Sequence, residues 1–235
     1  AVNEKHGIWY NPMTGEYHEA TIGDKGIQLN LKSGESRILI TSNKPVNEWK
    51  LGSKVKVNEK EAIAAADSKT IDLTENAWKL SFTEDAPKVG ETFNLKGVKS
   101  WEGLSEKAKV MMGTGVYETT IKLSKDDAKK QWTIDLGDVR ESARVYVNNK
   151  YIGCAWAVPY ILNCKDALNK GKNTIRIEVT NLPANRIAEM DRQGVKWRKM
   201  KDINVVDINY KKTTYENWTP VSSGLNSTVK LVEIK

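Results

Sequence analysis

The sequence predicts an all-β protein, a β-sandwich preceded by a small antiparallel β unit, and three observations favour this fold class. Hydrophobic and polar residues alternate through the second half of the chain, with the period of two that is typical of strands buried on one face. Asn and Gly residues separate these runs at short intervals, as turns require. Helical periodicity is scarce, so we expect helix in fewer than about a fifth of the residues, against about a third in a typical globular protein.

The chain divides most naturally near residue 75. A new alternating strand starts at residues 78–82, and residues 76–235 have the right size for one sandwich. Residues 1–75 form the small β unit in this interpretation. Such a unit buries little apolar surface by itself, and we therefore interpret it as the tail of an upstream domain.

Local signals inside the small unit are weaker. Ser33 and Gly34 predict a hairpin between residues 27–31 and 37–40. The Ala-rich stretch 59–66 is the one place where a short helix would fit the composition.

Four strands of the sandwich have a clear inward face. The residues predicted to point inward are Tyr117, Thr119, Ile121 and Leu123; Trp132, Ile134 and Leu136; Ala143, Val145 and Val147; and Ile175, Ile177 and Val179. Asn148 and Asn149 predict a hairpin turn, because Asn tolerates a positive φ. Short helical turns are expected at 126–130 and 165–168.

The charges argue against a nucleic-acid-binding protein. The formal net charge is +7, from 37 basic and 30 acidic residues, but the two signs are interleaved along the chain. The densest basic cluster is Lys196, Arg198, Lys199 and Lys201, which a solvated loop explains better than a phosphate track. No run of about twenty apolar residues occurs, so we expect no membrane span.

The two cysteines, Cys154 and Cys164, are too few for a disulfide framework and lack a zinc-binding pattern. They could pair with each other if their Cβ vectors meet, or they could be small buried hydrophobic residues. We favour free thiols, because Cys154 falls on a predicted strand whose geometry need not suit Cys164.

The run from residue 132 to 181 carries a resemblance to a known family. It is similar to the sugar-binding jelly roll attached to many bacterial glycoside hydrolases, including family 2 enzymes, and looks closest to the C-terminal domain of large α-L-rhamnosidases. The matching pieces are residues 135–143, 147–149, 156–159 and 179–186, the chain end at 220–231, and the flanking segments 9–15 and 113–120. The sequence departs from the family pattern at Met111 and Met112, at 192–218, which is longer and more basic, and at 226–228.

This resemblance implies a galactose-binding-like jelly roll in a secreted glycoside hydrolase that acts on plant or microbial polysaccharide. The location would be the bacterial periplasm or the extracellular space. Residues 1–6 lack the features of a signal peptide, so we expect the sequence to begin inside a longer chain. The resemblance requires no cofactor. A structural calcium is common in such sandwiches, but the sequence does not place one.

Catalytic residues are not expected in this chain. Glycoside hydrolysis needs two carboxylates about 5 to 10 Å apart, and no acidic residue here sits in a recognisable catalytic motif. Glu118 and Glu178 fall on outward strand faces, and the only histidines are His6 and His18. In the families that the chain resembles, the catalytic carboxylates belong to a separate barrel domain.

Seven residues are candidates for carbohydrate binding or for docking to another domain. They are Trp156, Pro159, Tyr160, Arg140, Glu141, Asn185 and Arg186. An Arg can hold sugar hydroxyls or a carboxylate with two hydrogen bonds, and it can equally brace loops. The aromatic step at 156–160 could stack on sugar, contact the catalytic domain or plug the core. We expect this step and 185–186 to lie at the same end of the sandwich, because loops cluster at its ends.

Two functions follow from these expectations. The leading hypothesis is a non-catalytic accessory domain whose partners are carbohydrate, the catalytic domain of the parent chain, or both. The alternative is an independent carbohydrate-binding module.

Overall fold

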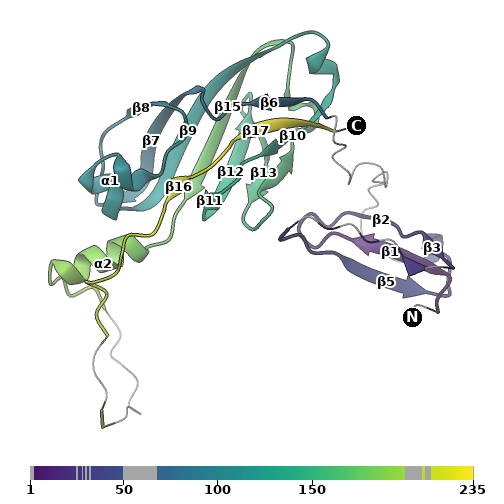
Figure 1. Ribbon diagram of the computed structural model, residues 1–235, viewed down its shortest axis with the longest axis horizontal. Coiled ribbons are helices and arrows are strands. Elements are labelled where there is room, and N and C mark those ends of the chain that lie inside the picture. The colour runs from purple at the N-terminus through teal and green to yellow at the C-terminus, as the bar shows by residue number, and fades with distance from the viewer. Residues whose placement is uncertain are drawn as a thin grey trace. The chain divides into compact units, whose positions relative to one another are not determined.

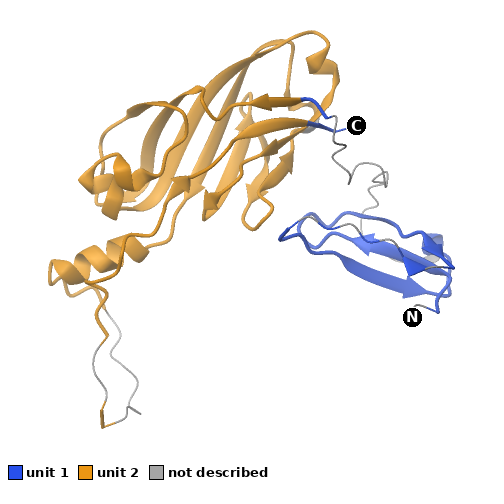
Figure 2. Ribbon diagram, viewed as in Figure 1, with its two compact units in different colours: residues 1–69, 233–235 blue, residues 70–232 orange. Residues whose placement is uncertain are grey.

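A computed structural model describes residues 3–24, 26–27, 29, 31, 33–49, 68–198, 208–209 and 213–234. The chain forms two compact units, residues 1–69 with 233–235 and residues 70–232 (Figure 2). Strand β6 (Thr70–Asp72) belongs to the larger unit because it pairs with β17 (Lys230–Ile234). The division therefore falls at 69/70, before the position 75/76 that the sequence favoured.

The smaller unit is built around β1 (His6–Tyr10), which pairs antiparallel with β2 (Tyr17–Glu19) and β5 (Ile38–Ser42). Ile8, Tyr17 and Val46 form its buried core, with Val46 supplied by a 3₁₀ turn, η1 (Val46–Glu48). A two-stranded ribbon joins β3 (Ile22–Gly23) to β4 (Gly26–Ile27).

The hairpin expected around residues 33 and 34 is wrong. Strand β5 pairs with β1, and β4 pairs with β3, so the two predicted arms have different partners. Strand β5 pairs with β1 residue by residue over its whole length, from Ile38 opposite Tyr10 to Ser42 opposite His6, and this pairing takes the place of the hairpin. The Ala-rich stretch 59–66 lies outside the described residues.

The larger unit is a sandwich of a six-stranded and a four-stranded sheet (Figure 1). The six-stranded sheet has the order β13-β12-β15-β9-β7-β8. The bounds of its strands are β13 Lys150–Ala155, β12 Ser142–Val147, β15 Gly171–Thr180, β9 Met112–Leu123, β7 Ala77–Ala86 and β8 Phe93–Lys96. The four-stranded sheet has the order β14-β10-β17-β6, where β14 is Ile161–Asn163 and β10 is Gln131–Asp135. A short ribbon pairs β11 (Val139–Arg140) with β16 (Gly224–Leu225).

The core lies between the two large sheets. Every residue predicted to point inward is buried, from Trp132 and Ile134 of β10 to Ile175 and Ile177 of β15. Leu231 of β17 joins the same cluster from the smaller sheet. The prediction of an all-β jelly-roll sandwich preceded by a small antiparallel β unit is confirmed.

Asn residues fix the turns at one end of the sandwich. Asn148 and Asn149 have φ values of 51° and 65°, as the hairpin prediction required. The side-chain amide of Asn148 donates to the carbonyl oxygens of Ala167 and of the Asn173 side chain, both at 2.8 Å. Asn173 is fully buried. Buried amides that are satisfied in this way hold two turns together.

Helices are short in the described part of the chain. In the larger unit the expected turns appear as 3₁₀ segments η4 (Asp127–Lys129) and η5 (Lys165–Ala167), and η3 (Trp101–Gly103) was not predicted. Two α-helices were not predicted. Helix α1 (Glu106–Val110) starts where the hydroxyl of Ser105 accepts a hydrogen bond from the backbone of Ala108, an N-cap. Helix α2 (Ala184–Arg192) follows Pro183.

Candidate functional site

Strand register brings several candidate segments to one end of the six-stranded sheet. Ala143 of β12 pairs with Ala155 of β13 and with Val179 of β15. The residues that flank these pairs, namely Glu141, Trp156 and Asn181, therefore lie at the same strand ends. Figure 1 shows β11 and α2 at this end of the sandwich.

Arg140 forms an ion pair with Asp138 in this region. Its Nε lies 2.8 Å from Oδ1 of Asp138, and its Nη2 donates to Oδ2 at 3.2 Å. These hydrogen bonds are the main reason why the pKa of Arg140 is raised. Asp138 is anchored in turn, because its backbone N–H donates to the hydroxyl of Ser227 at 2.7 Å and its carbonyl accepts from Asn226. The guanidinium is therefore held in place although it remains exposed to solvent.

Tyr160 and Glu141 lie beside this ion pair. Burial is the largest cause that raises the pKa of the Tyr160 hydroxyl, the negative charge of Glu141 raises it further, and Arg140 acts in the opposite direction. The backbone of Tyr160 accepts a 2.9 Å hydrogen bond from Leu136, at the end of β10. Asp138, Arg140, Glu141 and Tyr160 thus form one group, named here the Arg140 cluster.

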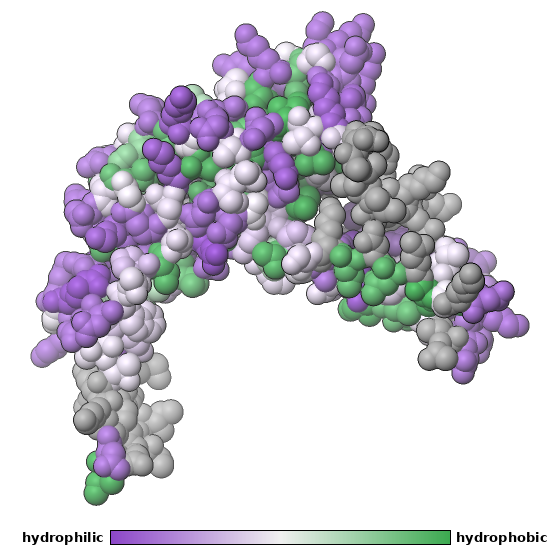
Figure 3. Space-filling view, viewed as in Figure 1, coloured by the Kyte–Doolittle hydropathy of each residue, from purple (hydrophilic) through white to green (hydrophobic). Residues whose placement is uncertain are grey.

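Trp156 is not a core residue, because 60% of its surface is exposed. Val158 is 52% exposed, and Pro159 and Tyr160 are half-buried. The core-plug interpretation therefore fails for Trp156. Hydrophobic residues are otherwise scattered among hydrophilic ones on the visible face of the larger unit (Figure 3). An exposed indole near a charged cluster is a combination suited to ligand contact.

Asn185 and Arg186 occupy a different part of the same end. They lie on α2, which packs against α1 and β9, whereas Trp156 follows the edge strand β13. The strands β9 and β13 are three places apart in the sheet, which corresponds to about 14 Å. Asn185 is 4% exposed, and its amide exchanges two 2.8 Å hydrogen bonds with the backbone of Val221. Asn185 therefore braces the backbone at Val221, and it is not part of the Arg140 cluster.

An aromatic group that the sequence analysis missed follows α2. The rings of Trp197 and Tyr215 lie 6.3 Å apart, and those of Tyr215 and Trp218 lie 4.4 Å apart. Asp191 accepts a 2.6 Å hydrogen bond from the indole of Trp197 and a 2.8 Å bond from the backbone of Tyr215. Arg198 lies over both rings, at 5.0 and 5.4 Å from their centroids. We name residues 195–198 and 213–218 the arm.

The arm changes the interpretation of the basic cluster. Arg198 is committed to the rings and to the carbonyl oxygen of Thr213, so it is not a solvated loop residue. Lys199 and Lys201 lie outside the described residues. The signal in the sequence was the pair of Trp residues at 197 and 218 inside a stretch that is unusually long for the family.

The sequence also raised expectations about metal ions, thiols and membrane spans. Within the described ranges, no three His, Cys, Asp or Glu side chains are grouped so that they could hold a metal ion. Cys154 and Cys164 are free thiols. None of the helices in the described part of the chain is long and apolar enough to span a membrane.

Comparisons with known proteins agree with this architecture. The model of the family described as "Glycosyl hydrolase 2 galactose-binding domain-like" matches residues 104–223, just over half of the chain. A "Putative beta-glucuronidase" of Formosa agariphila is 27% identical over 232 residues, which cover 88% of this chain and 20% of that protein.

Solved structures share the fold. A rhamnosidase from Novosphingobium sp. PP1Y superposes with a TM-score of 0.71 and 23% identity, over 99% of this chain and 21% of that protein. A β-D-glucuronidase from Dictyoglomus thermophilum gives a TM-score of 0.51 and 16% identity, over 72% of this chain and 28% of the other. The chain thus spans about a fifth of the length of the β-glucuronidase relative from Formosa agariphila and of the rhamnosidase.

The family match covers strands β9 to β15, the Arg140 cluster except for its supporting residues at 226–227, and helix α2. Most of the segments on which the resemblance in the sequence rested lie inside this match, whereas residues 9–15 and 224–231 lie outside it. The chain belongs to the family of galactose-binding-like domains of glycoside hydrolase family 2.

Proposed function

We propose that this chain is a non-catalytic accessory domain of a secreted glycoside hydrolase, and that the Arg140 cluster with Trp156 is its carbohydrate-contacting surface. The observation that carries the proposal is the arrangement at the strand ends. A guanidinium held by Asp138 lies beside Glu141 and Tyr160, and Trp156 is exposed near them.

Carbohydrate suits this chemistry better than a purely apolar ligand. A pyranose presents hydroxyl groups that both donate and accept, and it presents C–H faces that stack on an indole. Arg140 supplies donors and Glu141 supplies acceptors, while Tyr160 offers a hydroxyl that does either. The ion pair with Asp138 orients the guanidinium before a ligand arrives, which lowers the entropic cost of binding.

In this proposal, the longer protein to which the chain belongs carries its catalytic carboxylates in another domain. The names of the relatives support a glycosidase, and the small fraction of their length that this chain spans supports a separate catalytic region. We propose α-L-rhamnosidase activity for the parent, in the periplasm or outside the cell, on plant or microbial polysaccharide. β-Glucuronidase activity is the second candidate, which the 27% identity to the relative from Formosa agariphila favours. Assay of the parent on aryl α-L-rhamnoside and aryl β-D-glucuronide distinguishes the two.

The test of the surface is a binding measurement on the 235-residue chain. We expect glycan-array hits whose affinity, measured by calorimetry, falls by about 1 to 3 kcal/mol in Trp156→Ala, the scale for losing a stacked aromatic contact. Arg140→Ala should weaken the same ligands. Lys125→Ala, an exposed residue in the turn after β9, is the matched control and should change nothing.

Equal affinity in wild type and Trp156→Ala would remove the carbohydrate role of this surface. Hydrolysis of an aryl glycoside by the purified chain, abolished by replacing one of its carboxylates, would contradict the non-catalytic role. If the isolated chain binds a polysaccharide as tightly as the parent does, the independent carbohydrate-binding module replaces the accessory role.

A further inference from the structure

One register row crosses the outer face of the whole six-stranded sheet. Each member is directly opposite the next on the neighbouring strand, and the row runs from β8 to β13. Its members are Asn94, Lys79, Glu118, Arg176, Tyr146 and Tyr151. The adjacent residues on the same strands, such as Trp78, Tyr117 and Ile177, are buried in the core. The side chains of the row therefore project away from the core, and we name this set the cross-sheet row.

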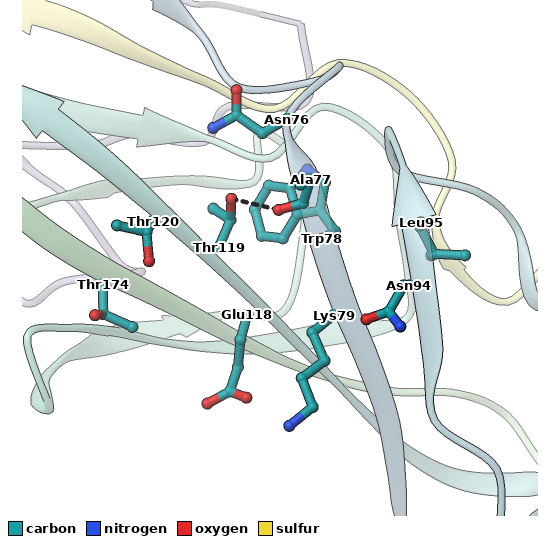
Figure 4. A pocket seen from close by; sticks show the side chains of 10 residues that line it. All are labelled: Asn76, Ala77, Trp78, Lys79, Asn94, Leu95, Glu118, Thr119, Thr120 and Thr174. Atoms are coloured by element: carbon teal, nitrogen blue, oxygen red, sulfur yellow. Dashed lines mark hydrogen bonds between the residues drawn. The ribbon is translucent and has the colours of Figure 1, made fainter.

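The first half of the row lines a pocket of about 670 Å³ (Figure 4). Lys79, Asn94 and Glu118 contribute to it, together with Thr120 and Thr174 from the neighbouring register positions. The volume lies within the range of about 300 to 1,000 Å³ that is usual for small-ligand sites, and the pocket is shallow and open to solvent. Figure 4 shows the side chains of Lys79 and Glu118 pointing in the same direction, away from Trp78.

The hydroxyl of Thr119 in this pocket donates a 2.8 Å hydrogen bond to the carbonyl oxygen of Ala77, but five other polar side chains of the lining are uncommitted. In the ranges that the structure describes, the five side chains of Lys79, Asn94, Glu118, Thr120 and Thr174 form no hydrogen bond or ion pair with one another or with any other residue. Lys79 and Glu118 are opposite in register, yet they form no ion pair. An ammonium, a carboxylate, an amide and two hydroxyls thus remain available to one ligand.

The second half of the row is aromatic. The guanidinium of Arg176 lies 4.1 Å from the ring centroid of Tyr146, and the rings of Tyr146 and Tyr151 are 5.4 Å apart. Arg176 is also paired with Glu178 at 3.0 Å, but its Nε is buried without a hydrogen-bond partner. Tyr151 is 54% exposed at the edge of the sheet, and its ring remains open for stacking.

We propose that the cross-sheet row and the adjoining pocket bind an uncharged oligosaccharide. The ligand would lie across the strands with one sugar in the pocket and another against Tyr151. The row spans five strand spacings, about 24 Å, so it matches an extended chain better than a single sugar. Sugar hydroxyls can serve donors and acceptors alike, and C–H faces of a pyranose pack on a tyrosine ring.

The charges on this face argue against the other classes of ligand. Glu118 and Glu178 lie close to Lys79, Arg176 and Arg144, so the face has charges of both signs and would repel a phosphate backbone at two positions. A protein partner would have to desolvate Lys79 and Glu118 together, without an ion pair between them to offset the cost. A wet, hydroxylated ligand avoids that cost because it supplies hydrogen bonds of its own.

This site is separate from the Arg140 cluster, so the inference goes beyond the proposed function. Tyr151 and Trp156 are at opposite ends of β13, about 16 Å apart along the strand. Variants at the two sites can therefore be tested independently in the same chain.

The experiment is a titration of the 235-residue chain with cellohexaose, xylohexaose and mannohexaose, and with hexagalacturonate as a charged counterpart. Binding is followed by calorimetry and by amide chemical shifts in NMR spectra. We expect at least one of the neutral hexasaccharides to bind and to shift residues on β9, β12 and β13. Tyr151→Ala and Glu118→Ala should each weaken this binding by about fivefold or more. Lys122→Ala, outward-facing on the same strand as Glu118, should leave the affinity unchanged.

Several outcomes would overturn the inference. One is that no neutral hexasaccharide binds at millimolar concentration, and another is that hexagalacturonate alone binds. A third is that Tyr151→Ala and Glu118→Ala bind the neutral probe with the same affinity as wild type. Trp156→Ala separates the two proposals. If it abolishes all binding while the Tyr151 and Glu118 variants behave as wild type, the proposed function stands and the cross-sheet site does not. If Trp156→Ala has no effect while Tyr151→Ala and Glu118→Ala lose binding, the cross-sheet site stands and the carbohydrate role of the Arg140 cluster does not.

Discussion

The indole N–H of Trp101 donates a 2.7 Å hydrogen bond to the hydroxyl of Tyr117, deep in the sandwich, and Gly224 lies directly against both side chains. The same hydroxyl accepts from the backbone of Leu225 at 3.3 Å and donates to the carbonyl of Lys99 at 3.3 Å. One phenol therefore connects β9, the segment before α1 and the strand β16. Strand β16 pairs with β11, so the contact supports the backbone that carries Arg140.

Replacing Gly224 by Ala should be severely destabilising. Gly224 has a φ of 93°, and a Cβ at this position would overlap Trp101 and Tyr117. Overpacking costs about 1 to 3 kcal/mol, and the left-handed backbone adds about 1 kcal/mol. We therefore expect Gly224→Ala to lower the free energy of unfolding by about 2 to 4 kcal/mol, measured by urea denaturation.

Substitutions at two other glycines distinguish the cost of steric overlap from the cost of backbone strain. Gly90 has a φ of 74° but no neighbour within 4 Å of a Cβ, so Gly90→Ala should cost only the strain, about 1 kcal/mol. Gly103 also has open space and no left-handed φ, and Gly103→Ala should be close to neutral. Equal effects of all three substitutions would contradict the packing described for Gly224.

Asn185 provides a test of bracing against ligand binding. Asn185→Ala removes both hydrogen bonds to the backbone of Val221, each worth about 1 kcal/mol, so we expect a loss of about 2 kcal/mol in unfolding free energy. Glycan affinity of the folded fraction should not change. Arg186→Ala on the same helix should change the stability by less than about 0.5 kcal/mol. If the Asn185→Ala protein is as stable as wild type but has lost glycan binding, Asn185 contributes to the binding surface and does not act as a brace.

Much of the sandwich could be predicted because the desolvation of apolar side chains imposes a period of two on each strand. This is why Val145, Ile177 and their neighbours were placed correctly on the inward face. The turn at Asn148 was also predictable, because few residues accept its positive φ. Both signals are local in the sequence.

The parts that could not be predicted depend on distant partners. Asn185 is defined by Val221, 36 residues away, and nothing near Asn185 in the sequence indicates that contact. Asp191 acts through Tyr215, 24 residues away. Whether the ring of Trp156 is exposed depends on where the edge strand β13 ends. The alternation of polar and apolar residues does not determine whether this ring faces the core or the solvent. The cross-sheet row requires the register of six strands at once.

Cys164 should make stability sensitive to alkaline pH. It is fully buried, and burial raises the pKa of its thiol from 9.0 to about 12. Above pH 9 the unfolded chain loses this proton while the folded chain keeps it, so folded-state stability falls as the pH rises from about 9 towards 12. We expect the stability difference between wild type and Cys164→Ala, measured by urea unfolding from pH 7 to pH 10.5, to shrink above pH 9. A difference that stays constant over this range would contradict the raised pKa.

The same burial predicts unequal thiol reactivity. Cys154 is partly exposed on β13, so a thiol reagent at pH 8 should modify one cysteine in the native chain and the second only after unfolding. Cys154→Ser removes the fast reaction and serves as the control. Rapid modification of Cys164 in the folded protein would show that its site opens readily.

Asp191 should control the order of the arm without controlling the stability of the sandwich. Its carboxylate accepts from the indole of Trp197 and from the backbone of Tyr215, and hydrogen bonds to a charged group contribute about 1.5 to 3 kcal/mol each. In Asp191→Ala we expect the indole N–H of Trp197 and the amide of Tyr215 to exchange with solvent at least about tenfold faster, measured by NMR. The midpoint of global unfolding should shift little, because the arm lies outside the core cluster and can open locally. Glu216→Ala removes a carboxylate from the same arm that holds neither ring, so its exchange rates should match those of wild type. A large fall in the global midpoint of Asp191→Ala would instead mean that the arm unfolds together with the sandwich.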